Sequence, residues 1–321
     1  MTSPYSPLTH ESDILLLRIP PRSHVSGDNQ SFRLIHVSLA RREHLPSYET
    51  ISYCWGDPAD SAQVNIDGFM LDVPQSTAEV LERVTLEDRE RCVWIDAVCI
   101  NQANLEERSH EVTLMGLIYS SAVRNLIYLG KAEDSEVTNS LAALEMITSD
   151  IHASINKQGY SDFSSFISAI WRGDATAVTA LDHHFNGESL LVFFNRPWFS
   201  RVWVVQEAVL SAENICLYGN REINLELALE AGRWLSKFRF FNLDERFQMN
   251  RGLMNATVLY EQREQMALDG GVAFALTFGM TSSLQMTDLR DKVFGTLGMC
   301  FENETENRIS ELLAVDYNKP Y

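Results

Sequence analysis

Residues 91–102 (RCVWIDAVCINQ) constrain the fold more than any other stretch of this chain. Residues 92–95 are an unbroken apolar run of bulky and β-branched side chains, which is typical of a strand covered on both faces. Asp96 then interrupts the run. A carboxylate near the carboxyl end of a buried strand lies at the edge of an open α/β sheet, where such sheets bind their ligands. We therefore expect a functional site at this edge.

Alternating strands and helices surround this strand. From residue 48 onward, the order is strand, hairpin, helix, strand, helix, strand. With the hairpin at 64–73 set aside as an insertion, this order predicts a βαβαβ unit with a parallel sheet. The other segments of the unit are strands at 48–55 and 125–129, helices at 74–84 and 104–122, and a fourth candidate strand at 214–218.

The pattern divides the chain into three regions. Residues 1–43 contain two predicted strands, 13–19 and 32–39, which should pack on the core. Residues 44–220 form the α/β core, with a helical insertion at about 150–194. A mostly apolar helix is predicted at 198–210, and residues 221–321 are predicted to be a helical region whose first helix is 225–238. The sequence stops without a finishing element, so we expect the native protein to continue.

Composition limits the partners and the compartment. A net charge of −18 makes nucleic acid and anionic membranes unsuitable partners. The five cysteines are scattered and lie mostly in apolar runs, as in a protein with reduced thiols. Neither a signal peptide nor an apolar run of about 18 residues is visible, so we expect a soluble cytoplasmic protein without a membrane anchor.

Four blocks of the sequence point to a known family when they are taken together and in order. They are 48–56 (YETISYCWG), 91–102 running into Glu107, Arg108 and 115–122 (MGLIYSSA), 196–207 (RPWFSRVWVVQE), and 288–298 (DLRDKVFGTLG). These blocks resemble the fungal heterokaryon incompatibility (HET) domain, over roughly residues 32–300. The resemblance implies a role in fungal non-self recognition that ends in regulated cell death, with self-association through the domain and a protein recognition partner.

The HET domain in turn is similar, at a distance, to TIR domains, some of which cleave NAD. This implies an α/β fold with a TIR-like or flavodoxin-like central parallel sheet flanked by helices. The residue pattern adds an N-terminal β-hairpin and a helical C-terminal region, and the extra C-terminal helices are not a TIR feature. NAD-cleaving TIR domains carry a tryptophan four residues before a catalytic glutamate, and Trp203 and Glu207 have that spacing. Ser52 and Tyr53 match the Ser-Tyr-like pair at the end of the first TIR strand. Val204 departs from the pattern, which has cysteine there.

Glu207 is the candidate catalytic residue. Its neighbours in sequence are apolar, so its carboxyl must be paired, neutral or facing a cleft. The structural alternative is a salt bridge with Arg201 or Arg196. Cleavage of the nicotinamide–ribose bond passes through an oxocarbenium-like state, and nicotinamide in NAD is already a cationic leaving group. One carboxylate could therefore suffice, with NAD as substrate and no cofactor.

Other candidate ligand-binding residues follow the strands. Trp55 could stack on a nicotinamide or adenine ring or lie in the core. Gly56 could allow close approach of a ligand or simply form a turn. Asp96 could bind a ribose hydroxyl or anchor backbone amides of the turn after it. The chain has no GxGxxG, which argues against a Rossmann dehydrogenase. Any of four arginines, at positions 91, 108, 196 and 201, could meet a pyrophosphate or form internal ion pairs.

Thiol and metal chemistry are not expected. Cys54 and Cys99 lie within the blocks, but none of the blocks contains the histidine that a thiol nucleophile requires. His183 and His184 have no spaced partner, so no metal site is predicted.

Two mechanisms remain open. In one, assembly of several copies completes an NAD-cleaving site. In the other, the domain is a non-enzymatic module that signals by oligomerising. The first predicts that Ser52, Tyr53, Asp96, Trp203 and Glu207 cluster at one cleft, and the second that Glu207 is buried in a salt bridge away from the strand ends.

Overall fold

The computed structural model describes residues 3–24, 31–172, 186–238, 245–282, 284–300 and 315–318. These residues form a mixed α/β fold around a nine-stranded sheet of order β5-β4-β2-β1-β6-β3-β7-β8-β9. The strands are β1 Asp13–Ile19, β2 Ser31–Ser38, β3 Glu49–Ser52, β4 Ser61–Ile66, β5 Phe69–Pro74, β6 Arg91–Trp94, β7 Asn125–Tyr128, β8 Asn214–Tyr218 and β9 Arg221–Asn224.

The centre of the sheet is parallel, as the sequence predicted. β3 pairs in parallel with β6 on one side and β7 on the other, and β7 pairs in parallel with β8. Every residue of β3 and β7 is buried, because helices cover both faces of the central strands. The hairpin of β1 and β2 extends the sheet through an antiparallel pairing of β1 with β6, and the predicted hairpin at 64–73 is present as β4 and β5.

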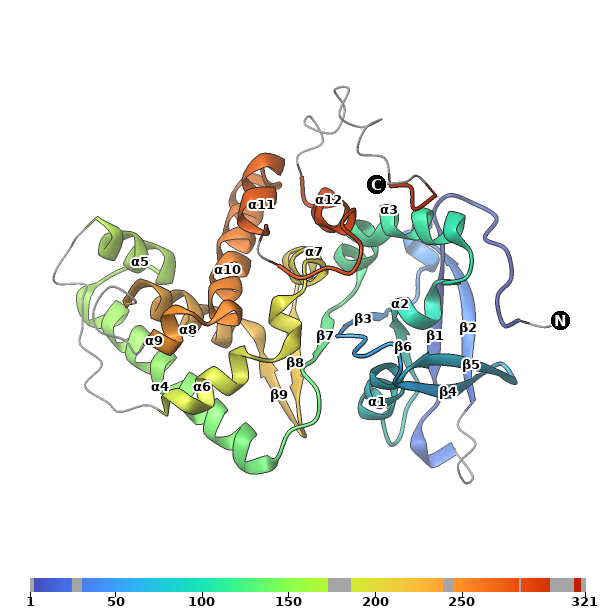
Figure 1. The fold of residues 1–321 in the computed structure, drawn as a ribbon, viewed down its shortest axis with the longest axis horizontal. Helices are drawn as coiled ribbons and strands as arrows, with labels where there is room; N and C mark the ends of the chain where they lie inside the picture. Colours follow the sequence, from blue (N-terminus) through green and yellow to red (C-terminus); the bar gives the residue numbers. More distant parts are fainter. Residues whose placement is uncertain are drawn as a thin grey trace.

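Helices connect and cover the strands (Figure 1). Figure 1 places α4–α6 and α8–α10 together at the β9 end of the sheet, and α1–α3 at the end that holds β1 and β2. Two hydrophobic clusters match this division, one built mainly from residues 14–126 and one mainly from residues 127–299. The helices are α1 Gln75–Val84, α2 Asp96–Cys99, α3 Leu105–Ser121, α4 Asp134–Gln158, α5 Phe163–Trp171, α6 Gly187–Phe194, α7 Trp203–Leu210, α8 Leu225–Phe238, α9 Glu245–Gln248, α10 Arg251–Asp269, α11 Phe274–Met280 and α12 Asp291–Leu297, with 3₁₀ turns η1 Arg22–His24, η2 Arg42–His44 and η3 Pro197–Ser200.

Residues 91–102 do not form one strand. β6 ends at Trp94, and α2 follows as a single helical turn. The carbonyl of Ile95 accepts from the backbone nitrogens of Val98 and Cys99, at 3.1 and 2.8 Å. The sequence analysis expected a turn after Asp96 but not a helical one, because the side chains of Ala97, Val98 and Cys99 are buried and hydrophobicity continues without a change of period.

The helix predicted at 198–210 is also wrong in extent. It is divided into η3 and α7, with Arg201 and Val202 between them. Residue 285 interrupts the helical hydrogen bonding there: Val202 N donates to Gln285 O at 3.0 Å, and Gln285 N donates to Ser200 O at 2.6 Å. A pairing across more than 80 residues cannot be read from local periodicity.

Other expectations have mixed outcomes. β9 lies where only helices were predicted, and pairs antiparallel with β8. The insertion at 150–194 contains the end of α4, α5 and α6, while residues 173–185, with His183 and His184, lie outside the described residues. The region boundaries at 43 and 220 stay predictions. In the described part of the chain, no helix has both the length and the apolar character needed to cross a bilayer.

Gly252 provides a test of how α10 packs on α6. A Cβ at Gly252 would lie 1.7 Å from the carbonyl oxygen of Phe194. We expect Gly252→Ala to lower the free energy of unfolding by about 1–3 kcal/mol, because two backbones must separate. Gly279→Ala is the matched control, since a Cβ there meets nothing within 4 Å. Urea unfolding should show the loss only for Gly252→Ala, and equal stability of the two variants would contradict this packing.

Candidate functional site

A cleft of about 830 Å³ opens at the carboxyl ends of β3 and β6. Because β6 and β7 lie on opposite sides of β3, the helices that follow these strands leave a crevice at this edge. The walls come from the loop after β3, the start of α2, α3, η3, α7 and the N-terminal part of α12. The cleft is lined by six of the eight predicted site residues: Trp55, Gly56, Asp96, Arg201, Trp203 and Glu207.

Glu207 lies at the floor of the cleft, one turn into α7, and is only 5% exposed. The hydroxyl of Ser52, the last residue of β3, donates to Glu207 Oε2. Trp198 Nε1 in turn donates to Ser52 Oγ at 2.6 Å. Ser52 does not line the cleft itself, but it holds the catalytic candidate against the end of the strand. The sequence prediction did not single out Trp198, although it belongs to the block at 196–207.

Opposing interactions set the pKa of the Glu207 carboxyl. Burial raises the pKa of its carboxyl to about 7, against the opposing effects of the Arg201 charge and the Ser52 hydrogen bond, and Asp96 raises it further. At neutral pH both protonation states are therefore populated. Such a pKa suits a carboxyl that must be ionised during part of a reaction.

Arg201 acts on the acids of the cleft through its charge, and among the described residues it forms no salt bridge. Its Nη1 donates to the main-chain carbonyl of Tyr53. Burial alone would lower the pKa of Arg201, but Cys54, Glu207 and Asp96 raise it overall. Arg196 is engaged elsewhere, in a salt bridge with Glu136. Among the described residues Glu207 is thus not paired with either arginine, unlike in the structural alternative.

Asp96 and Trp55 form one rim of the cleft. Trp55 Nε1 donates to both carboxylate oxygens of Asp96, at 3.2 and 3.0 Å, and the backbone nitrogen of Ala97 donates to Asp96 Oδ1 at 2.7 Å. Trp55 is 36% exposed, so it belongs to the rim and not to the core. Asp96 both anchors its own turn and faces the cleft. Gly56 has φ of 81°, which explains glycine there by the turn itself.

Tyr53 does not bring its side chain to the cleft. Its hydroxyl is hydrogen-bonded to Thr77 Oγ1 at 2.7 Å and also interacts with the carboxyl of Asp96, and its carbonyl accepts from Arg201. Of the five residues expected to cluster, three line the cleft and Ser52 supports it from below. Side-chain alternation explains this, because Ser52 and Tyr53 are neighbours and point to opposite faces.

Two of the four candidate arginines lie where they can contact an anion in the cleft. Arg91 forms a salt bridge with Glu49 at 2.9 Å. Arg108 and Arg201 both line the cleft, and neither forms a salt bridge with a carboxylate among the described residues. Cys54 also lines the cleft, but burial raises its pKa and no histidine lines the described walls, so it is unsuited to act as a thiolate.

Comparison with known proteins identifies the class of protein that this fold and cleft belong to. Residues 48–207 match the family model for heterokaryon incompatibility protein (HET), and this stretch runs from the residue before β3 to Glu207 itself. These residues, just under half of the chain, are therefore a HET domain.

One relative gives a more particular comparison. The chain is 29% identical over 206 residues to "Heterokaryon incompatibility protein 6, OR allele" of Neurospora crassa. The alignment covers 57% of this chain and 30% of that protein, so the chain spans about a third of its relative's length. No solved structure matches the chain.

A second buried carboxyl offers a comparison for Glu207. Glu111 of α3 is fully buried away from the cleft, and neither of its oxygens has a hydrogen-bond partner among the described residues. Burial, with the neighbouring charge of Glu107, raises its pKa to about 8. Glu207 and Glu111 thus share burial and differ in their access to the cleft.

Glu207 should make the protein less stable as the pH rises. A carboxyl whose pKa is about 7 in the folded protein and near 4.5 when unfolded binds its proton more tightly in the folded state. Stability therefore falls between pH 4.5 and 7, by on the order of 3 kcal/mol for this shift. We expect Glu207→Gln to flatten the stability profile over this range, measured by urea unfolding at pH 5 to 8.

Glu111→Gln supplies the comparison for this experiment. It should flatten a range that extends to about pH 8, because that carboxyl titrates higher. If Glu207→Gln leaves the profile of the wild type unchanged, Glu207 is an ordinary solvated carboxylate and the site is wrongly described.

Proposed function

We propose that this protein acts in fungal non-self recognition and triggers regulated cell death, by hydrolysing NAD to nicotinamide and ADP-ribose products when several copies assemble. The HET domain supports the biological role. One observation carries the chemical part: a buried carboxyl with a raised pKa, Glu207, faces a cleft at the carboxyl ends of parallel strands.

The sheet supports a flavodoxin-like or TIR-like arrangement of the core. Numbered along the chain, the parallel strands β3, β6, β7 and β8 have the spatial order 2-1-3-4. Flavodoxin-like sheets have this order and bind ligands beside their first strand, where the order reverses. Trp203 and Glu207 lie one turn apart on α7, so both can face the same crevice.

The chemistry requires little beyond a correctly placed carboxylate. The bond between ribose C1′ and the nicotinamide nitrogen breaks, and both bonding electrons go to nicotinamide, which leaves as a neutral molecule. Ionised Glu207 stabilises the positive charge that develops on the ribose. Water then bonds to C1′ and releases a proton to Glu207 or to solvent.

The remaining walls suit the other parts of a dinucleotide. Trp55 at the rim and Trp203 within the cleft offer aromatic faces for the bases. Arg108 and Arg201 offer positive charge to the pyrophosphate. The cleft volume of about 830 Å³ is within the range of sites that bind small organic ligands.

NAD hydrolysis tests this function directly. Purified protein, assayed at rising concentration so that self-association can occur, should convert NAD to nicotinamide, measured by chromatography. We expect Glu207→Gln to slow the reaction by about 100-fold or more, because it removes the stabilising charge. Wild-type activity should rise with pH through about 7, as Glu207 ionises.

Glu111→Gln is the matched control for this assay, since it alters a buried carboxyl outside the cleft and should leave the rate unchanged. A wild type that leaves NAD intact at every concentration would favour the alternative, a non-enzymatic module that signals by self-association. Equal activity of the wild type and Glu207→Gln would remove Glu207 from the reaction.

A further inference from the structure

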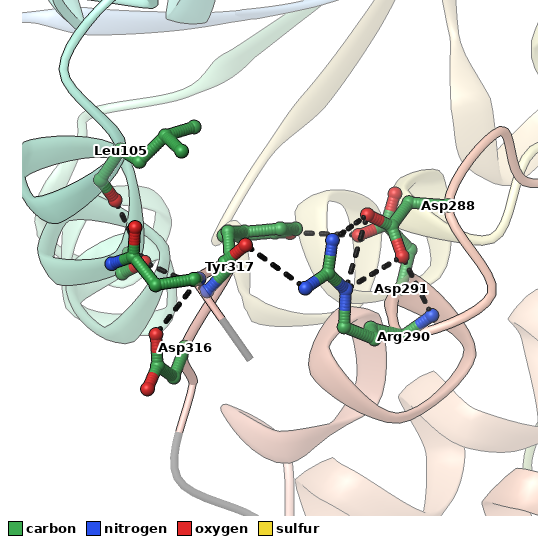
Figure 2. Close-up of polar contacts among 8 residues, drawn as sticks. Leu105, Asp288, Arg290, Asp291, Asp316 and Tyr317 are labelled. Carbon is green, nitrogen blue, oxygen red and sulfur yellow. Dashed lines mark hydrogen bonds and ion pairs between the residues drawn. The ribbon is translucent and has the colours of Figure 1, made fainter. Parts of the chain in front are cut away.

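Residues 315–318 cross from α3 to α12 at the edge of the cleft (Figure 2). Tyr317 is inserted between the two helices and is 6% exposed, whereas Asn318 beside it is exposed. The sequence gives no sign of this contact, because more than 200 residues separate Tyr317 from its partner in α3.

Each polar group of Tyr317 has a partner. Its backbone nitrogen donates to Ser109 Oγ of α3 at 3.0 Å. Its hydroxyl donates to Asp291 Oδ1 of α12 at 2.7 Å, and its carbonyl accepts from Arg290 Nη1 at 3.0 Å. A single residue thus joins both helices by hydrogen bonds.

The aromatic ring is held as well. The guanidinium of Arg108 lies 4.1 Å from the ring centroid, and the ring of Phe294 meets it edge-on at 5.4 Å. Asp288 holds the Arg290 guanidinium in position for the Tyr317 carbonyl: it accepts from Arg290 Nε at 2.9 Å and from Nη2 at 2.6 Å. The space between α3 and α12 is therefore a binding site for the Tyr317 side chain, with contacts to both its ring and its polar groups.

Tyr317, Arg108 and Asp291 also line the cleft. At the other end of α12, Gly298, the residue after the helix, packs against α3, since a Cβ at Gly116 would lie 3.3 Å from Gly298 Cα. Trp203 packs against α12 at Gly295, where an added Cβ would lie 3.5 Å from the tryptophan ring. α12 is thus fastened to α3 at one end by backbone contact and bridged to it by Tyr317 at the other.

We propose that residues 315–318 are a releasable clasp, in which Tyr317 holds α3 and α12 together and keeps the cleft narrow. Withdrawal of Tyr317 lets the N-terminal end of α12 move away from α3 and widens the entrance. On the proposed function, the clasp restrains access of NAD to Glu207, and its withdrawal activates the protein.

Thiol labelling measures the width of the cleft without any assumption about activity. Cys54 lines the cleft, and Cys92 is similarly half-buried but lies outside it. With N-ethylmaleimide and peptide mass spectrometry, Tyr317→Ala should label Cys54 several-fold faster than the wild type, with the rate at Cys92 unchanged. Tyr317→Phe, which keeps the ring and loses the hydroxyl contacts with Asp291 and Arg108, should fall between the two. Asn318→Ala is the matched control and should match the wild type.

If Cys54 is labelled at the same rate in Tyr317→Ala and in the wild type, the clasp proposal is overturned. An equal rise in the labelling rate of Cys92 would also overturn it, because it indicates general loosening of the structure. Arg290→Gln provides a second variant that weakens the same site, with the same expectation. NAD hydrolysis in these variants separates the two proposals. Faster labelling of Cys54 without any NAD loss would support the clasp and contradict the enzymatic function. NAD loss with unchanged labelling would support the enzymatic function and contradict the clasp.

Discussion

The hydroxyl of Ser52 is the interaction on which the cleft depends. It accepts a hydrogen bond from Trp198 of η3 and donates one to Glu207 of α7, so the end of the first parallel strand fastens both segments. A buried carboxyl needs such a donor, because desolvation otherwise expels it or keeps it neutral. The break between η3 and α7 lets both side chains reach the same hydroxyl, and it leaves Arg201 free to turn toward the Tyr53 carbonyl.

The sequence predicted those features of the fold that depend on residues close together in the chain. β1, β8 and α8 have the bounds that hydrophobic runs and glycine breakers indicated, and the parallel order followed from the alternation of strands and helices. The candidate site was predicted in part, since six of eight residues line one cleft. The inward direction of Tyr53, the division of the helix at 198–210 and the contribution of Tyr317 depend on partners far along the chain, which periodicity does not report.

The arginines of the cleft have different partners from the arginines in the rest of the protein. The chain carries 44 acidic residues against 26 lysines and arginines, and most half-buried arginines find carboxylate partners. Arg108 and Arg201 instead stack on an aromatic ring and bind a backbone carbonyl. The charge of Arg201 opposes the effect of burial on the acids of the cleft, yet the pKa values of Glu207 and Asp96 stay raised.

Direct titration of Glu207 tests the central claim, that a buried carboxyl faces a cationic ligand group. Carbon-13 NMR of protein labelled at glutamate carboxyls, with Glu207→Gln for assignment, would follow its ionisation with and without a hydrolysis-resistant NAD analogue that keeps the cationic pyridinium. We predict a pKa of about 7 in the free protein, lowered when the analogue binds, because the cation favours the ionised form. A pKa near 4.5, or one that the analogue leaves unchanged, would contradict the account.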